Sequence, residues 1–486
     1  MARDSRIKLE GELARLGLFT EAHLDAANAA LARIEAEGIE TVRVVFADQH
    51  GILRGKTIVA GAFASAIRNG VSVTSTLLLK DTAHRTVFPI WSDDIGFGHG
   101  ALTGGADILM APDPATFRVL PWSRHSGWVL CDLFQKDGSP IAMSSRRILR
   151  DAVERLAARG MKFVCGLEVE FYVFRIKEPR LEHADGGMPC TPPETSLISH
   201  GYQYLTEARY DALEEVMDDL RRACQEIGLP IRSTEAEFGP SQCEFTFEPD
   251  GAMEHADAMV LFRSLVKQVC ARKGLHATFM CRPKVDFGMA SGWHLHQSVI
   301  DMKTGDNLFM PGADGRLSEI ASNWIAGLLD HAAETCLLTT PTVNGYKRYQ
   351  AFQLAPDRIQ WGRDNRGAMI RGLMTPGDNA SRVENRVAEP AANPYLYFAS
   401  QILSGLDGIE RRLEAPVPVE NPYGSDAIRL PTSLIGAIER FEASAFYKKA
   451  LGPDFVAYLT QIKRSEWERY LTTISEWEQR EYFSLF

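Results

Sequence analysis

The chain has 486 residues, enough for a sizeable hydrophobic core and two or three domains of ordinary size. It is 45% hydrophobic and 24% charged, which is typical of a soluble globular protein, and its net charge of −10 argues against broad binding to nucleic acid or anionic membranes. Eight scattered cysteines without a C-x-x-C pair, no signal-peptide pattern and no long apolar run favour a cytoplasmic protein with reduced thiols and no membrane span.

The first part of the chain is expected to form a small domain rich in strands. Its expected elements are a helix over 7–37, a strand over 41–47, a turn at 48–51 and a second strand ending near residue 59. Strands and loops are expected to dominate up to about residue 135. The Asp-Gly-Ser-Pro turn at 137–140 then marks a boundary between domains 1–138 and 139–486.

The second domain is expected to mix helices and strands, which makes the fold class α+β. Its elements are expected to be a helix over 144–159 capped by Ser144 or Ser145, a strand over 162–174, a Gly/Pro-rich loop over 185–194, a helix over 207–227, a strand pair over 230–248, a helix over 253–273, strands flanking 277–299 and a surface loop over 413–431.

One motif invites a wrong interpretation. The segment 51–57 reads GILRGKT, but it has three residues between its glycines where a phosphate-binding P-loop has four. No helical pattern begins at Lys56, and Thr-Ile-Val continues as a strand. A hairpin with a basic tip is the better interpretation.

Two strands carry paired polar side chains that suggest a metal site. In GLEVEFYVF, Glu168 and Glu170 are two residues apart and therefore share one face of the strand, as do His294 and His296 in SGWHLHQS. Two carboxylates on one face of so apolar a strand repel each other unless a cation lies between them. A solvated strand face remains the alternative for the glutamates, and hydrogen-bonded core or surface residues remain the alternative for the histidines.

A turn and an arginine-rich stretch complete the pattern. In EAEFGPSQCEF, the Gly-Pro-Ser turn can fold Glu237 and Glu244 back toward one point, although an unremarkable surface loop would look the same. Residues 347–386 are rich in arginine, which holds carboxylate and phosphate in bidentate geometry, and end in RVENR. A solvated basic face is the alternative. Glutamates and histidine around divalent cations, with arginines beside them, suit phosphoryl transfer from ATP to a carboxylate.

These residues resemble those of the glutamine synthetases. The motifs, in the family's order, are GLEVEF, EFGPSQCE, SGWHLHQS, NGYKR with Ala-Pro following, and WGRDNRGAMIR ending in RVENR and ANPYL, within residues 41–412. The resemblance implies a glutamine synthetase-like fold with a small N-terminal β-grasp domain and a large catalytic α+β domain with a curved antiparallel sheet. It also implies a cytoplasmic homo-oligomer, a dodecamer of two hexameric rings, that uses ATP and two or more Mg2+ or Mn2+ ions per site.

The resemblance assigns roles to individual residues. One metal ion would be held by Glu170, Glu237 and Glu244, and the other by Glu168, His294 and Glu384. His296, Ser298, Arg371 and Arg382 match positions near the nucleotide. Arg348 and Arg386 match arginines that hold the carboxylates of L-glutamate, and Arg366 matches one that faces the transferring phosphate. The implied reaction phosphorylates the γ-carboxylate, and an amine then displaces phosphate from this γ-glutamyl phosphate.

The ammonium site departs from the family's pattern. The family's glutamate just before Ala-Pro, which attracts ammonium and takes its proton, is replaced by Leu354, and the matching stretch 71–79 of the N-terminal domain contains no acid. Trapping ammonium takes negative charge and activating it takes a base, whereas leucine suits an amine with a hydrocarbon body. The sequence therefore predicts a γ-glutamylamide ligase that favours an aromatic amine such as aniline, then an alkylamine.

Leu354 and Tyr202 are expected to line the amine pocket. Met289-Ala290 stands where the family has Asn-Gly, which leaves a related acyl substrate open. Two alternatives to the amide ligase remain. One is an ordinary glutamine synthetase that uses ammonia, and the other is a non-catalytic structural relative.

Overall fold

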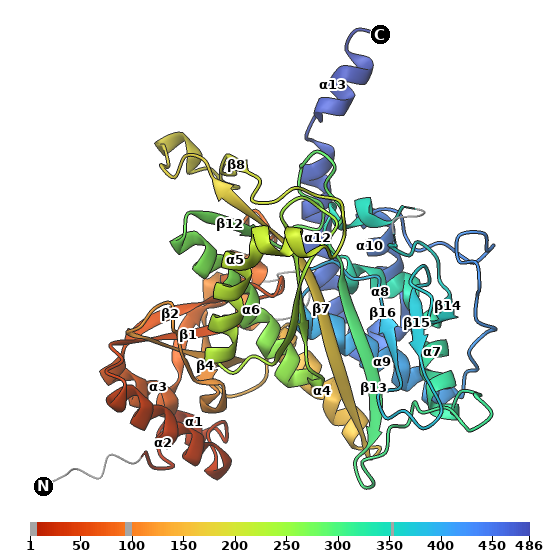
Figure 1. The fold of residues 1–486 in the computed structure, drawn as a ribbon. Helices are drawn as coiled ribbons and strands as arrows, with labels where there is room; N and C mark the ends of the chain where they lie inside the picture. The colour runs from red at the N-terminus through yellow and green to blue at the C-terminus, as the bar shows by residue number, and fades with distance from the viewer. Residues whose placement is uncertain (1–6, 93–99, 351–353) are drawn as a thin grey trace, which may run out of the picture.

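The computed structural model describes residues 7–92, 100–350 and 354–486. Within them the chain forms two sheets, a smaller one near the N-terminus and a larger one covered by helices (Figure 1). This is the predicted α+β architecture. The boundary between residues 138 and 139 remains a prediction.

The N-terminal sheet has six strands in the order β2-β1-β6-β4-β3, with β5 paired to β6. Its strands are β1 (Thr41–Ala47), β2 (Leu53–Val59), β3 (Val71–Thr74), β4 (Asp107–Pro112), β5 (Arg118–Val119) and β6 (Ser126–Phe134). The predicted β1–β2 hairpin is confirmed, with Thr41 opposite Val59. Lys56 therefore lies within β2, as expected for a hairpin and not for a P-loop.

Two expectations for this region were wrong in detail. The single helix expected over 7–37 is two helices, α1 (Glu12–Arg15) and α2 (Glu21–Ala36), because Gly17 has a positive φ and Thr20 begins α2 with a capping box. A further helix, α3 (Phe63–Asn69), lies in the stretch where strands and loops were expected to dominate and no helix was placed. It has seven residues, too few for a clear helical period.

The rest of the chain, which we call the catalytic region after the fold that the resemblance implies, contains a ten-stranded sheet. Its strand order is β14-β15-β16-β13-β7-β10-β9, and β7 also pairs with β8, β11 and β12. Its strands are β7 (Met161–Ile176), β8 (Thr195–Ser196), β9 (Ile231–Ala236), β10 (Gln242–Phe247), β11 (Asp250–Gly251), β12 (Leu275–Thr278), β13 (Trp293–Asp301), β14 (Trp361–Arg363), β15 (Ile370–Leu373) and β16 (Arg382–Asn385). All neighbours are antiparallel except β14 and β15.

The other regular elements of this region are helices, some of which pack on the sheet. They are α4 (Ser145–Ala157), α5 (Glu207–Glu226), α6 (Ala252–Arg272), α7 (Glu319–Asp330), α8 (Ala332–Thr339), α9 (Pro394–Arg411), α10 (Leu434–Ala443), α11 (Ala445–Leu451), α12 (Pro453–Leu471) and α13 (Glu476–Tyr482). Phe171 of β7 packs on Phe262 of α6, and Trp293 of β13 packs on Tyr397 of α9. None of the helices in the described ranges is long and apolar enough to cross a bilayer. The C-terminal helix α13 projects away from the body (Figure 1).

Candidate active site

The alternation of side chains along β7 places its two glutamates on the face opposite the helices. Leu167, Val169 and Phe171 are fully buried and point toward the helical layer. Glu168 and Glu170 therefore share the other face, as the sequence predicts.

Register across four neighbouring strands brings five of the six predicted metal ligands close together on one face of the sheet. His294 on β13 lies opposite Glu168 on β7, and Glu244 on β10 lies opposite Glu170. On the other side of β13, Glu384 of β16 lies opposite His296. Side chains directly opposite each other in antiparallel strands are close neighbours, so the pairing itself assembles the cluster.

Glu168, His294 and Glu384 form the tighter of the two predicted ligand sets. One ligand atom from each lies within 4.8 Å of the others. Nδ1 of His294 is 3.1 Å from Oε2 of Glu168 and 3.5 Å from Oε1 of Glu384. Burial, and then the charge of Arg386, lower the pKa of His294 to about 4, so the ring is neutral at pH 7 and keeps a lone pair for a cation.

The second set consists of Glu170, Glu237 and Glu244. The turn at Gly239–Ser241 folds Glu237 back so that its carboxyl group hydrogen-bonds that of Glu244. Burial, and then the charge of Glu237, raise the pKa of Glu170 to about 8, and burial also raises the pKa of Glu237 and Glu244. Three such carboxyl groups ionise together only beside a cation, which is what a divalent metal site supplies.

Four predicted arginines stand beside these acids. Nη1 of Arg348 donates to the backbone oxygens of Arg386 and Val387, which fixes the guanidinium next to His294. Glu384 forms ion pairs with Arg371, at 3.1 Å, and with Arg386. Arg366 lines the same cavity as the other three, so all four arginines contribute to the wall that an anionic substrate would meet.

Two cavities meet at the cluster. The larger, of about 740 Å3, is lined by five of the six predicted ligands and by the four arginines. The sixth ligand, Glu384, is fully buried behind this wall. The smaller, of about 390 Å3, is lined by His296, Ser298 and Arg382, three of the four residues predicted to lie near the nucleotide. Arg371, the fourth, lines the larger cavity instead. Glu168 and Glu235 border both cavities.

A chain of hydrogen bonds runs between the two cavities. Nε of Arg382 donates to Nδ1 of His296 at 3.0 Å, so Nε2 of His296 carries the proton and donates to Oε1 of Glu168 at 2.8 Å. Glu235 has no role among the sequence predictions, yet it borders both cavities. Its Glu-Ala-Glu spacing with Glu237 is the signal that could have found it.

Part of the lining of the larger cavity is apolar. It consists of Leu354, which is 46% exposed, Tyr204, Leu205, Phe238 and Met289, and we refer to these side chains as the apolar end. The rings of Tyr204 and Phe238 stack with centroids 4.3 Å apart and planes 6° from parallel. The Ala290 that departs from the family pattern lines the cavity as well.

Tyr202 does not join this lining. It is 66% exposed, and the guanidinium carbon of Arg209 lies 5.3 Å from its ring centroid. The chain is left-handed at Tyr202, Gln203 and Leu205, so the loop turns sharply and directs Tyr204 and Leu205 to the cavity. The tyrosine chosen from the sequence was two positions away from the one that lines the cavity.

Comparison with known proteins gives a consistent result. A sequence model described as glutamine synthetase, catalytic domain, matches residues 142–482. The chain is 40% identical to a γ-glutamylanilide synthase of Acinetobacter sp, over 96% of this chain and 97% of that protein. It is 31% identical to a glutamate–isopropylamine ligase of Pseudomonas sp, over 93% and 96% of the two chains. The solved structure "Apo GmaS without ligand" superposes with a TM-score of 0.76 at 27% identity, over 93% of this chain and 99% of that one.

The fold, the site and these relatives define an ATP-dependent carbon–nitrogen ligase. The chain belongs to the glutamine synthetase family. The predicted strands that carry Glu168 and Glu170, and His294 and His296, are β7 and β13.

Proposed function

We propose that the protein joins the γ-carboxylate of L-glutamate to an organic amine other than ammonia, with aniline-like amines favoured and alkylamines next. The apolar lining of the catalytic cavity carries this proposal. Leu354 and the stacked rings of Tyr204 and Phe238 line the same cavity, which suits an aromatic body. The names of two relatives, a γ-glutamylanilide synthase and a glutamate–isopropylamine ligase, support the same class of substrate.

The residues fit the two metal ions that the family uses. Glu168, His294 and Glu384 would hold one Mg2+ or Mn2+, and Glu170, Glu237 and Glu244 the other, since carboxylate oxygen and neutral imidazole are suitable donors. The ions would supply charge compensation for the phosphates of ATP. His296, Ser298 and Arg382 would bind the nucleotide in the smaller cavity.

The arginines position the acyl substrate. Arg348 and Arg386 would hold the carboxylates of glutamate in fixed orientation, and Arg366 would neutralise charge on the transferring phosphoryl group. In the γ-glutamyl phosphate intermediate, the amine nitrogen bonds to the γ-carbon as the carbon–oxygen bond to phosphate breaks, and the amine proton leaves with phosphate or water. An aromatic amine is neutral at pH 7, so it needs no general base at position 354.

Steady-state release of ADP with glutamate and different amines tests the proposal. We expect a higher kcat/KM with aniline or isopropylamine than with ammonia. A higher value with ammonia would favour an ordinary glutamine synthetase. No glutamate- and amine-dependent ADP release across a broad amine panel would favour a structural relative, although a scaffold has no need for six converging ligands.

We also infer a homo-oligomer, a dodecamer of two hexameric rings. The projecting C-terminal arm supports self-association, because large apolar side chains on it are exposed, among them Ile474, Trp477, Phe483 and Phe486. Sedimentation of the full chain measures the stoichiometry, and a monomer at micromolar concentration would contradict this inference.

A further inference from the structure

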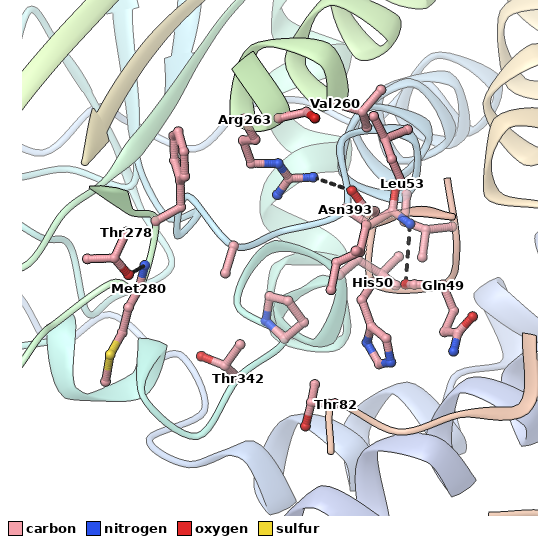
Figure 2. Close-up of a pocket in the computed structure, with 18 of the residues that line it drawn as sticks. Gln49, His50, Leu53, Thr82, Val260, Arg263, Thr278, Met280, Thr342 and Asn393 are labelled. Atoms are coloured by element: carbon pink, nitrogen blue, oxygen red, sulfur yellow. Dashed lines mark hydrogen bonds between the residues drawn. The ribbon is translucent and has the colours of Figure 1, made fainter. Parts of the chain in front are cut away.

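A second large cavity lies away from the catalytic cluster. It has a volume of about 470 Å3 and shares no lining residue with the two cavities described above. It lies where the turn between β1 and β2 meets α6, α9 and α12, so the N-terminal sheet and the catalytic region both contribute walls. Figure 2 shows His50 of that turn, Arg263 of α6 and Thr342 arranged around it.

Most of its wall is apolar. The contributing side chains include Leu53, Val260, Phe279, Leu337, Leu396 and Leu459. A cavity of this size falls within the range of small-molecule sites, about 300–1,000 Å3. An apolar wall of this extent suits an organic molecule better than a bare inorganic ion.

The charges in the wall have one sign. Among its described lining residues the cavity has three basic side chains, Arg263, Lys267 and Lys463, and no carboxylate. Lys463 is paired with Glu466, 3.1 Å from Nζ to Oε2. Positive charge concentrated in one cavity of an acidic chain favours an anionic occupant.

The other two cations have no acidic partner. No ion pair with Arg263 or Lys267 occurs among residues 7–92, 100–350 and 354–486. Arg263 donates to backbone oxygens of Gly51, Pro390 and Ala392, and the carboxylate of Asp48 acts on its charge without forming an ion pair with it. Burial lowers the pKa of Arg263 to about 10.

We propose that this cavity is a binding site for a small organic carboxylate with an apolar body. The carboxylate would pair with Lys267 and Arg263, and the body would occupy the wall formed by Val260, Phe279 and Leu337.

Such a ligand would also tie the N-terminal turn to the catalytic region. Arg263 already binds the backbone oxygen of Gly51, and Nδ2 of Asn393 donates to the backbone oxygen of Asp48 at 3.1 Å. The same amide donates to the backbone oxygen of Gln49 at 3.3 Å (Figure 2). Asn393 is the N-cap residue of α9. It lies eight residues after Asn385, the last residue of β16, which carries Glu384. A ligand in this cavity would therefore act on the catalytic cluster by fixing the position of the β1–β2 turn against Asn393.

Calorimetric titration of the full-length protein, without nucleotide or glutamate, tests the proposal. The probes are hexanoate, benzoate and phenylacetate, with benzamide as the uncharged match for benzoate. The variants are Lys267→Gln in this cavity, Arg366→Gln in the catalytic cavity, and Lys162→Gln at an exposed position of β7 as the matched control. Because Lys267 is itself exposed, its substitution is expected to leave folding and ligase activity intact.

We expect at least one carboxylate to bind the wild type, and its affinity for Lys267→Gln to be at least about tenfold lower. Its affinity for the other two variants should equal that for the wild type, and benzamide should not bind. Binding lost in Arg366→Gln but kept in Lys267→Gln would place the probe in the catalytic cavity and overturn the proposal. Equal binding of benzamide, or no binding by any of the three carboxylates, would overturn it as well. None of these outcomes depends on which amine the ligase uses.

Discussion

Glu244 lies directly opposite Glu170 where β10 pairs with β7, and both carboxyl groups are buried in the same cluster. Like charges facing each other across a strand pair are destabilising, and burial adds a desolvation cost. The arrangement therefore makes the stability of the fold depend on a bound cation or a bound proton.

Divalent metal is expected to stabilise the protein, and the substitution Glu244→Gln to weaken that effect. The folded pKa of Glu170, about 8, exceeds its ordinary value of 4.5, so the metal-free protein loses stability as pH rises from 4.5 toward 8. Glu244→Gln removes the opposing charge and should stabilise the metal-free protein by about 1–3 kcal/mol at pH 8. Thermal melting with and without Mn2+ measures both effects.

The matched control for this change is Glu248→Gln, at a side chain just beyond β10 that is 55% exposed. It should leave melting with and without Mn2+ unchanged. If Mn2+ raised the melting temperature of Glu244→Gln as much as that of the wild type, this would contradict a metal site at this position.

Leu354→Glu should raise the use of ammonia. A carboxylate at this end of the cavity attracts ammonium and can take its proton, so kcat/KM for ammonia should increase at least about tenfold, while that for aniline falls. Leu354 has φ near +53°, and Leu354→Gln keeps the same backbone strain and similar size without the charge. Comparing the rates of ADP release by the two variants separates the effect of the carboxylate charge from the effects of side-chain size and backbone strain. Equal gains in both, or none, would mean that residue 354 does not contact the amine.

Phe238→Ala should raise KM for aniline and leave that for methylamine nearly unchanged. The change removes the ring that stacks on Tyr204 at the apolar end of the cavity, and aromatic contacts of this kind contribute about 1 kcal/mol, or roughly five- to tenfold in KM. Phe287→Ala, at a 97% exposed ring that does not line the cavity, is the control. An equal rise for both amines would indicate general damage to the site.

His331 should stabilise the helical layer in acid and lose that effect in base. Its Nδ1 and Nε2 lie 2.6 and 2.8 Å from carboxylate oxygens of Glu334 and Asp407, which hold its pKa above the ordinary 6.5 although burial opposes them. A raised folded pKa gives stability that is full below pH 6.5 and is lost as pH rises through the folded value. His331→Gln should therefore cost about 1–2 kcal/mol at pH 6 and less at pH 9.

Urea unfolding at the two pH values measures this difference, with exposed His183→Gln as the control. A constant cost of His331→Gln at both pH values would assign its effect to packing on Phe446, whose ring centroid lies 3.7 Å away, and not to charge.

Alternation along β7 and β13 was enough to predict that Glu168 and Glu170 share one face, because the two-residue period is local. The pairing of Glu244 with Glu170 depends on which strand lies beside β7, and that is set by packing over the whole domain. The motifs supplied this information only through their likeness to a family with a known sheet.

The amine end was predicted less well for a physical reason. Three residues of the 202–205 loop, none of them glycine, adopt left-handed backbone conformations that nothing in the local sequence indicates. Those conformations determine that Tyr204 and not Tyr202 lines the cavity. The large cavity beneath the N-terminal turn was not foreseen either, because its walls come from segments far apart in the chain.

The most direct test of the account is a competition between amines. The protein is given L-glutamate, ATP and Mg2+ with equal concentrations of aniline and total ammonia at pH 7.5, and both products are quantified by mass spectrometry. The account predicts that γ-glutamylanilide exceeds glutamine by at least about tenfold, since the apolar cavity end favours the neutral aromatic amine. Glutamine as the main product would contradict it.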